Sequence, residues 1–198
     1  TLSECVGCDN GYISKHAQEN CVKCAMGKVS DYNKITCLKC DKGKYGDSSV
    51  MHELTSCKLC VSGKFSNRTG IIDNNRCISC PMGRYNIHTG STSTDNCKYC
   101  EAGKYRNDII GIKCTLCQQG KYSKKGANEC MLCDEGMYVH LISNMPTSCK
   151  FCPSGKFINK GGYLIESCKN CPAGKWSNEF GMTSVNKCIN CPHGKYSD

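Results

Sequence analysis

The pairing of the cysteines limits more strongly than any other feature what this chain can fold into. Its 22 cysteines all belong to C-x-x-C pairs, eleven in number, and none is left over. The pairs begin 16 to 20 residues apart along the whole sequence, which indicates tandem repeats in place of one globular core. We therefore expect residues 1–198 to form one continuous array without a linker. Repeats 1 to 11 begin, in order, near Cys5, Cys21, Cys37, Cys57, Cys77, Cys97, Cys114, Cys130, Cys149, Cys168 and Cys188.

A glycine follows each pair at a fixed distance. It is the third residue after the second cysteine in all eleven repeats, and we call it the repeat glycine. A turn with positive φ, or a close approach to a disulfide that a Cβ would obstruct, explains such a fixed glycine. Four of the five prolines directly follow the second cysteine, where a fixed φ suits the first corner of a tight turn. The repeat glycines are Gly11, Gly27, Gly43, Gly63, Gly83, Gly103, Gly120, Gly136, Gly155, Gly174 and Gly194.

After the repeat glycine come a basic residue and then an aromatic residue, each in nine of the eleven repeats. The full repeat reads C-x-x-C-x-x-G-K-Y-S. Because neighbouring residues of an extended segment point to opposite faces, we expect the aromatic side chain to cover a disulfide and the basic one to face water. The departures are Tyr12 and Ile13 in repeat 1, Val29 in repeat 2 and Met137 in repeat 8.

The rest of each repeat is polar and irregular, and its recurring glycines indicate hairpin loops. No segment has the apolar spacing of an amphipathic helix. Leu, Ile, Val and Phe together make up 32 of the 198 residues, which is too few for a conventional core. We therefore predict a small disulfide-rich fold, an elongated solenoid-like array of short β-hairpins and loops with essentially no helix.

Three chemistries use C-x-x-C pairs. The second cysteine of one repeat and the first of the next enclose 12 to 16 residues, which is close to the spacing of four-thiolate zinc sites. Against zinc, eleven pairs is an odd number, and the histidines have no regular ligand spacing. A thioredoxin-like redox motif is single and lies next to a βαβ unit, which this pattern lacks. Disulfides are favoured, and so many of them indicate an oxidising, extracellular location. The histidines are His16, His52, His88, His140 and His193.

The sequence predicts neither catalysis nor a cofactor, because it contains no nucleophile elbow, zinc-protease motif, phosphate-binding loop or pair of carboxylates at a fixed offset. The net charge of +9 favours anionic partners, but the Lys/Arg runs typical of nucleic-acid binding are absent. No stretch of the sequence is long and apolar enough for a membrane span.

The repeat resembles a known family of modules. The run C-P-x-G-K and an aromatic residue, followed by a polar loop and another cysteine in 152–168 and 171–188, is similar to ephrin-receptor-like cysteine-rich repeats. It also resembles the first module of tumour-necrosis-factor-receptor cysteine-rich domains, in the same growth-factor-receptor superfamily. Such repeats are abundant in secreted and surface proteins of protists and algae. The resemblance covers nearly all of the chain, and it specifies the module more closely than the function.

The resemblance implies that the second cysteine of each repeat pairs with the first cysteine of the next. The sequence by itself leaves open an interlaced pattern, in which each C-x-x-C shares its two bonds with different neighbours. The implied bonds are Cys8–Cys21, Cys24–Cys37, Cys40–Cys57, Cys60–Cys77, Cys80–Cys97, Cys100–Cys114, Cys117–Cys130, Cys133–Cys149, Cys152–Cys168 and Cys171–Cys188.

Cys5 and Cys191 have no partner in this scheme. We expect them to pair outward, with Cys191 bonded to a cysteine beyond Asp198. The chain would then be part of a longer array of the same repeats or a subunit stacked end to end.

The uniform repeats predict an extracellular structural protein, an elongated rod that forms or decorates a surface fibre, coat or flagellar hair. Its partners would be other copies of the array, an acidic polysaccharide that binds the basic positions, or a surface protein. The first alternative is a receptor or adhesin ectodomain with an atypical repeat. Phe151, Phe157 and Tyr163, beside Gly161 and Gly162, are the candidate cluster for it. The second is an intracellular zinc-binding repeat protein.

Two loops carry candidate glycosylation sites. Asn67, in the sequence Asn67-Arg68-Thr69, is the one standard acceptor for an N-linked glycan. The hydroxyl-rich segment 89–94 is either an acceptor of O-linked sugar or a bare polar loop.

Overall fold

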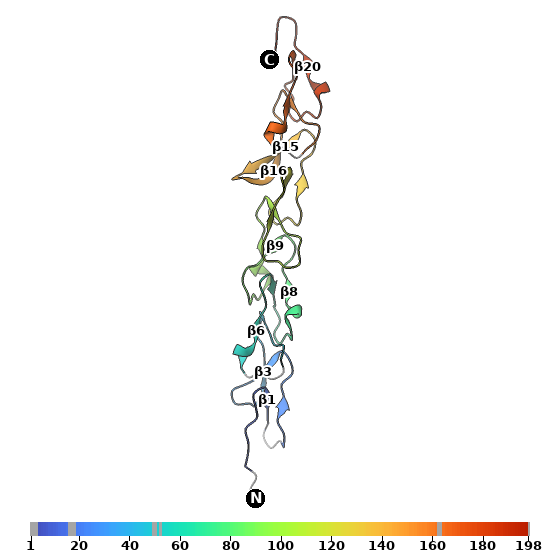
Figure 1. Cartoon of the computed structure of the whole chain (residues 1–198). Helices are drawn as coiled ribbons and strands as arrows, with labels where there is room; N and C mark the ends of the chain where they lie inside the picture. Colours follow the sequence, from blue (N-terminus) through green and yellow to red (C-terminus); the bar gives the residue numbers. More distant parts are fainter. Residues whose placement is uncertain (1–3, 16–18, 49–50, 52, 162–163, 198) are drawn as a thin grey trace. The chain divides into compact units, whose positions relative to one another are not determined.

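The computed structural model describes residues 4–15, 19–48, 51, 53–161 and 164–197. In this part of the chain the secondary structure consists of two-stranded antiparallel hairpins and five single-turn 3-10 helices, with no α-helix (Figure 1). The prediction of a small disulfide-rich fold of hairpins and loops is confirmed.

Each hairpin joins two successive repeats. Its first strand holds the basic and aromatic positions of one repeat, and its second strand holds the residues between the two cysteines of the next repeat. The strand pairs are β1 (Tyr12–Ile13) with β2 (Val22–Lys23), β3 (Lys28–Ser30) with β4 (Cys37–Lys39), β5 (Lys44–Tyr45) with β6 (Lys58–Leu59), β7 (Lys64–Phe65) with β8 (Ile78–Ser79), β9 (Arg84–Tyr85) with β10 (Lys98–Tyr99), β11 (Lys104–Tyr105) with β12 (Thr115–Leu116), β13 (Lys121–Tyr122) with β14 (Met131–Leu132), β15 (Met137–Ile142) with β16 (Met145–Phe151), β17 (Lys156–Phe157) with β18 (Lys169–Asn170), and β19 (Lys175–Trp176) with β20 (Ile189–Asn190).

The length of a repeat decides what its loop forms. Repeats of 19 or 20 residues have room for one 3-10 turn directly before the next cysteine, and five of them form it. Repeat 8 uses its extra residues for the long hairpin β15–β16, whose turn at Ser143 and Asn144 has positive φ at both residues (Figure 1). The helices are η1 (Leu54–Ser56), η2 (Asn74–Arg76), η3 (Thr94–Asn96), η4 (Ile165–Ser167) and η5 (Val185–Lys187).

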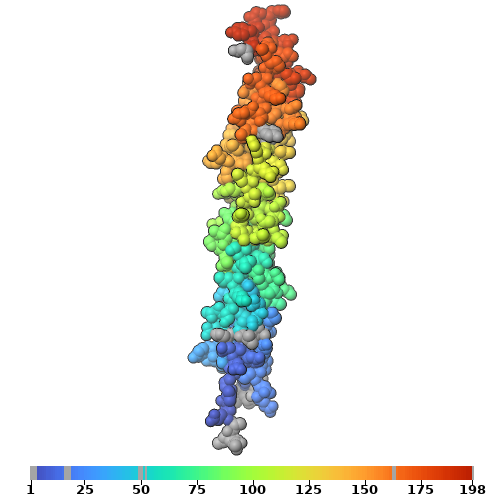
Figure 2. All heavy atoms as spheres, viewed as in Figure 1, coloured from blue at the N-terminus to red at the C-terminus, as the bar shows by residue number. Residues whose placement is uncertain are grey.

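The chain divides into two compact bodies. The first contains Thr1–Pro81, Tyr85–Lys98 and Asp108–Lys113, and the second contains Met82–Arg84, Tyr99–Asn107 and Cys114–Asp198. Within each body the repeats follow one another in sequence order (Figure 2). The same kind of hydrogen bond between successive repeats occurs in both bodies.

Backbone hydrogen bonds join each repeat to the next. In the first body the N–H of the repeat glycine Gly43 donates to the carbonyl of Ser66 at 2.9 Å, and the N–H of Ser66 donates to the carbonyl of Ser91 at 2.9 Å. In the second body Gly136 donates in the same way to Ile158 at 3.1 Å. Ser66 and Ile158 are the third residues after their repeat glycines, and we call this place the core position.

The core position is buried in most repeats, although small polar residues often occupy it. The buried residues at this position are Ser30, Gly46, Ser66, Asn86, Arg106, Ser123, Val139, Ile158 and Ser177. The sequence pattern predicts burial of the preceding aromatic residue and gives no sign that this position is buried. A small residue fits here because its backbone, more than its side chain, forms the contact between repeats.

Disulfides and a few apolar side chains make up the rest of the core. Phe65 is buried against Cys80 and Cys97, and Tyr138 packs on the cluster of Cys152 and Cys168. An aromatic side chain therefore covers a disulfide, as predicted, but the disulfide that it covers belongs to the next repeat. Trp176 and Tyr196, at the same position of their repeats, are exposed.

The basic positions are not simply solvated. Apart from Lys195, which is exposed, the basic residues at this position are half-buried along their hairpins, which is consistent with alkyl stems lying on the strand and charged ends in water.

The repeat glycines are required for two reasons. All eleven have φ between 72° and 86°. A Cβ on Gly43 would lie 2.2 Å from the carbonyl oxygen of Gly90, and one on Gly63 would lie 1.8 Å from that of Ile110, in each case two repeats further along. The close approach is thus to backbone two repeats away. This corrects the expectation of an approach to a disulfide.

Candidate binding surfaces

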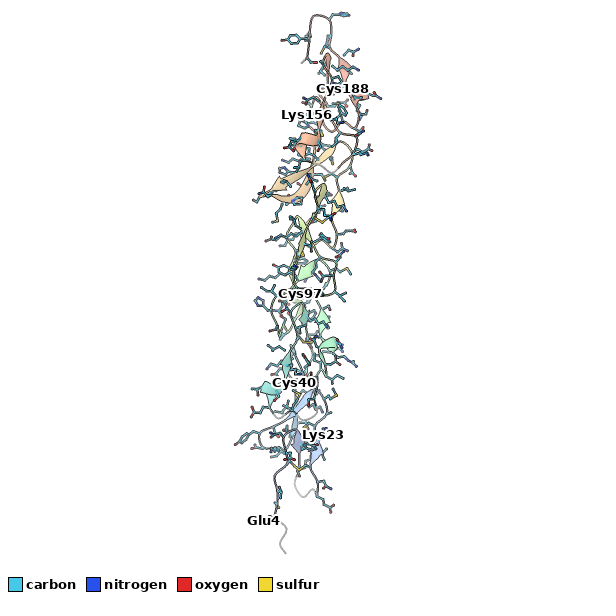
Figure 3. All side chains as sticks on the ribbon, in the orientation of Figure 1. Glu4, Lys23, Cys40, Cys97, Lys156 and Cys188 are labelled. Carbon is cyan, nitrogen blue, oxygen red and sulfur yellow. A yellow bond between two sulfur atoms is a disulfide. The ribbon has the colours of Figure 1, made fainter. Side chains whose placement is uncertain are left out.

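Ten disulfides join the second cysteine of each repeat to the first cysteine of the next. They run from Cys8–Cys21 to Cys171–Cys188 in the neighbour-to-neighbour order that the family resemblance implies, and none interlaces. The paired Cα atoms are 5.7 to 6.0 Å apart. Cys40, Cys97 and Cys188, labelled in Figure 3, each belong to one of these bonds. The twenty bonded cysteines offer no thiolate to a metal ion.

Cys5 and Cys191 are the two cysteines without a disulfide among the described residues. Cys5 is exposed and Cys191 is partly exposed. Their outward pairing stays a prediction. Within the described ranges, no group of three or more His, Cys, Asp or Glu side chains is arranged to hold a metal ion.

Ion pairs join three lysines to carboxylates in the part of the chain that the structure describes. Lys44 lies 4.0 Å from Asp41, and Lys104 lies 3.3 Å from Glu101. The Nζ of Lys58 donates to Asp47 at 2.7 Å, and this hydrogen bond lowers the pKa of Asp47 and raises the pKa of Lys58. These pairs are exposed, and they leave most of the positive charge of the chain facing solvent.

Tyr99 brings two cationic side chains together in the second body. The guanidinium carbon of Arg84 lies 3.9 Å from the centre of the Tyr99 ring, and its Nη2 donates to the phenol oxygen. The ammonium of Lys125 lies 5.9 Å from the same centre. Tyr99 is 49% exposed. The arrangement offers an anionic group two cations beside one aromatic ring.

Exposed aromatic side chains lie between the two cysteines of a repeat. The aromatic after the repeat glycine is half-buried in most repeats, whereas Tyr99 and Phe151 lie between the two cysteines and are exposed. In the strand β16, Phe151 packs against Gly181 of the next repeat. A side chain between the cysteines points outward because the second strand of a two-stranded hairpin has no further layer over it.

The predicted cluster around Phe151 is only partly brought together. Phe157 is half-buried in β17, and its backbone forms a bridge with Met182, beside the Gly181 on which Phe151 packs. Gly161 lies against the backbone of Cys133. Tyr163 and Gly162 lie outside the described residues. The exposed Phe180, next to Gly181, was not part of the sequence prediction.

The candidate glycosylation loops differ in access. Asn67 and Thr69 are exposed, and the turn between them is held by a hydrogen bond from the Arg68 N–H to the hydroxyl of Ser66. In segment 89–94 the threonines are exposed, but Ser91 is buried and its hydroxyl accepts a hydrogen bond from the Asn86 amide. Of the histidines, His88 and His193 are exposed and His140 is half-buried, while His16 and His52 lie outside the described residues.

An apolar hollow in the first body was missed by the sequence analysis. It has a volume of about 510 Å³ and is lined by aliphatic side chains from repeats 4 and 6, among them Val61, Ile109, Ile110 and Ile112. The signal was present in the sequence, because Asp108-Ile109-Ile110-Gly111-Ile112 replaces the polar loop that other repeats carry at this place.

Stacked hairpins with consecutive disulfides and a small apolar core define an extracellular type of cysteine-rich repeat module. Residues 46–97 and 120–162 match the family model described as tyrosine-protein kinase ephrin type A/B receptor-like. The chain is accordingly an array of cysteine-rich repeats, and the two matched segments are ephrin-receptor-like. This repeat family is not a family of enzymes. No curated protein matches the sequence significantly. In the described part of the chain, no helix has the length and apolar character that crossing a membrane requires.

Proposed function

We propose that the chain is an extracellular structural protein, an elongated disulfide-bonded rod that forms or decorates a surface fibre, coat or flagellar hair. One observation carries the proposal: the same bond from a repeat glycine to the core position of the next repeat recurs in both bodies. Contacts that recur along a chain are typical of structural repeat proteins, since a single binding site needs only one specialised region.

The disulfides suit this role because they replace a large apolar core. Each closes a loop of 13 to 17 residues. Such a loop adds roughly 3 kcal/mol of stability in the chain-entropy model. Extracellular fibres persist in an oxidising environment, where these bonds stay formed.

Electron microscopy of the native cell surface, with gold-labelled antibodies against this chain, tests the proposal. We expect gold particles along filaments or a regular coat. Label confined to isolated molecules scattered over the membrane contradicts the structural role.

A receptor or adhesin ectodomain is the second candidate, and two atypical repeats favour it. Repeat 6 carries the apolar hollow, and repeat 8 carries the long hairpin β15–β16 in place of a 3-10 turn. Scattered label in the microscopy experiment, together with saturable binding of one surface protein or glycan, is the result that this function predicts.

The proposal includes one continuous array over residues 1–198, no catalytic role, no cofactor and no nucleic-acid partner. Partners in the structural role are other copies of the array and an acidic polysaccharide, for which the cations around Tyr99 are the best-placed group. An intracellular zinc protein is the least favoured function. Stoichiometric zinc in the native protein, measured by atomic emission, would establish it and overturn the extracellular proposal.

A further inference from the structure

A rigid turn in repeat 6 displays isoleucine side chains to solvent. Ile109 is 81% exposed and Ile110 is 62% exposed. The turn is held by Asp108, whose Oδ1 accepts hydrogen bonds from the N–H groups of Ile110 and Gly111, both at 2.9 Å. The carboxylate thus fixes the backbone on which the two apolar side chains stand.

The other side of this turn is fixed to the neighbouring repeats. The carbonyl of Gly111 accepts a hydrogen bond from the Asn86 N–H at 2.8 Å, and the carbonyl of Ile110 lies against the Cα of Gly63. These contacts hold the backbone of the turn, from which Ile109 and Ile110 are exposed to solvent. Their exposure is therefore built into the fold of the first body.

The isoleucines line a hollow of about 510 Å³ together with Val61 and Ser62 of repeat 4. The hydroxyl of Ser62 donates to the carbonyl of Ile87 in repeat 5 at 3.0 Å. Three successive repeats thus hold one open apolar surface. Contiguous exposed apolar surface of this kind marks an interaction site in soluble proteins.

Cationic side chains outnumber carboxylates around the hollow. Lys64 lines it, and its ammonium donates to the carbonyl of Asn74 in η2, the helix that ends at the exposed Arg76. Lys113, which is exposed, directly follows Ile112. The nearby carboxylate of Asp73 accepts hydrogen bonds from the N–H groups of Asn75 and Arg76. The carboxylate of Asp108 likewise accepts hydrogen bonds from N–H groups of its own turn. Both carboxylates keep their charge, but Lys64, Arg76 and Lys113 outnumber them, so the net charge of the rim favours an anionic partner.

We propose that the hollow between Val61 and the Ile109-Ile110-Gly111-Ile112 turn is a docking site for a partner protein segment that inserts an aliphatic or aromatic side chain flanked by Asp or Glu. A second copy of this chain fits poorly, because its net charge of +9 would meet the same positive rim. The inference goes beyond the structural role and does not rest on it, because a fibre and a receptor alike can carry a docking site.

Peptide selection on the disulfide-bonded chain tests the site. A displayed library of random linear peptides is selected on the full chain, and the most enriched peptide is synthesised and titrated. We expect enriched sequences with one large apolar residue between carboxylates. Ile109→Asp and Lys113→Glu should each weaken binding of that peptide by about tenfold or more, as loss of an interface anchor does.

Matched variants in the second body control for general effects of charge and polarity. Ile142→Asp changes an isoleucine that is also exposed beside a tight turn, and Lys187→Glu makes the same charge change on η5. Both should leave the affinity unchanged, and all four variants should keep ten disulfides by intact mass. Failure to enrich peptides, enrichment of basic peptides, or equal binding to Ile109→Asp overturns the proposal. A dimer of the chain that Ile109→Asp dissociates also overturns it, in favour of a second copy.

Discussion

At the scale of the residue, the repeat glycines separate two constraints that usually act together. Gly63 has a φ of 79°, and a Cβ there would lie 1.8 Å from the Ile110 carbonyl oxygen. Gly174 has nearly the same φ, 77°, but a Cβ there would meet nothing within 4 Å. The free-energy cost of a left-handed backbone and the cost of a close contact can therefore be measured separately within one chain.

We expect Gly174→Ala to lower the free energy of unfolding by about 1 to 2 kcal/mol, which is the strain of a left-handed alanine. Gly63→Ala should lower it by about 3 kcal/mol or more, because the backbone of repeat 6 must also move. Denaturant unfolding of the oxidised protein measures both changes. Equal losses in the two variants would show that the contact between repeats 4 and 6 contributes nothing.

Glycosylation of Asn67 is a second prediction for a single residue. Its side chain is exposed, on a turn held by hydrogen bonds between Ser66 and Arg68. We expect the secreted protein to lose mass on treatment with an N-glycosidase, and the Asn67→Gln variant to lack that glycan from the start. An unmodified Asn67 peptide in the secreted protein contradicts the prediction.

At the scale of the element, each hairpin is closed by a disulfide between consecutive repeats. The Cys60–Cys77 bond closes the loop that contains β7 and η2. The repeat glycine bonds and the close glycine contacts extend one and two repeats along the chain. Damage to one hairpin should therefore stay local.

We expect the variant Cys60→Ser/Cys77→Ser to lose hydrogen-exchange protection at the Gly43 and Ser66 N–H groups, which donate to neighbouring repeats. Protection at Gly136, in the other body, should stay unchanged. Cys152→Ser/Cys168→Ser is the matched control, because its loop contains Ile158, the acceptor of the Gly136 N–H, and it should reverse the pattern between the two bodies. Loss of protection throughout the chain in either variant would refute independent hairpins.

The same elements show what the sequence predicts and what it does not. The hairpins follow from the spacing of the cysteines and the repeat glycines. A turn at the glycine and a disulfide that closes the loop leave the backbone between these two points little conformational freedom. The 3-10 turns were missed, since a segment such as Asn74–Arg76 has no apolar period and forms only when the repeat is long enough. The core position was missed because Ser66 or Ser123 looks like a surface residue, and its burial depends on backbone bonds to the next repeat.

The candidate binding surfaces are harder to predict from the sequence than the fold is. A side chain between two cysteines, such as Tyr99, is presented outward by the hairpin, and nothing in a local pattern says so. The apolar hollow needs Val61 and Ile110 from repeats that are adjacent only in the folded chain. Such surfaces depend on the contact between repeats two apart, which no spacing along the sequence reveals.

At the scale of the whole molecule, the order of the disulfides is the first property to measure. We expect non-reducing peptide mapping to recover pairs such as Cys40–Cys57 and Cys152–Cys168. Recovery of Cys40 bonded to Cys60 would establish an interlaced pattern, and the hairpin pairing of β5 with β6 would then be wrong.

The dimensions of the chain in solution give the last test. A compact domain of 198 residues has a radius of gyration of about 16 Å. Repeats joined by contacts to the next two repeats have no means of folding back into a sphere, so small-angle scattering should give a clearly larger radius. A reduced, unfolded chain would also be large, but its scattering would show the plateau of a flexible coil and its amides would lose protection. We therefore expect a large radius with protected amides in the oxidised protein, and a radius close to the compact value would refute the elongated array.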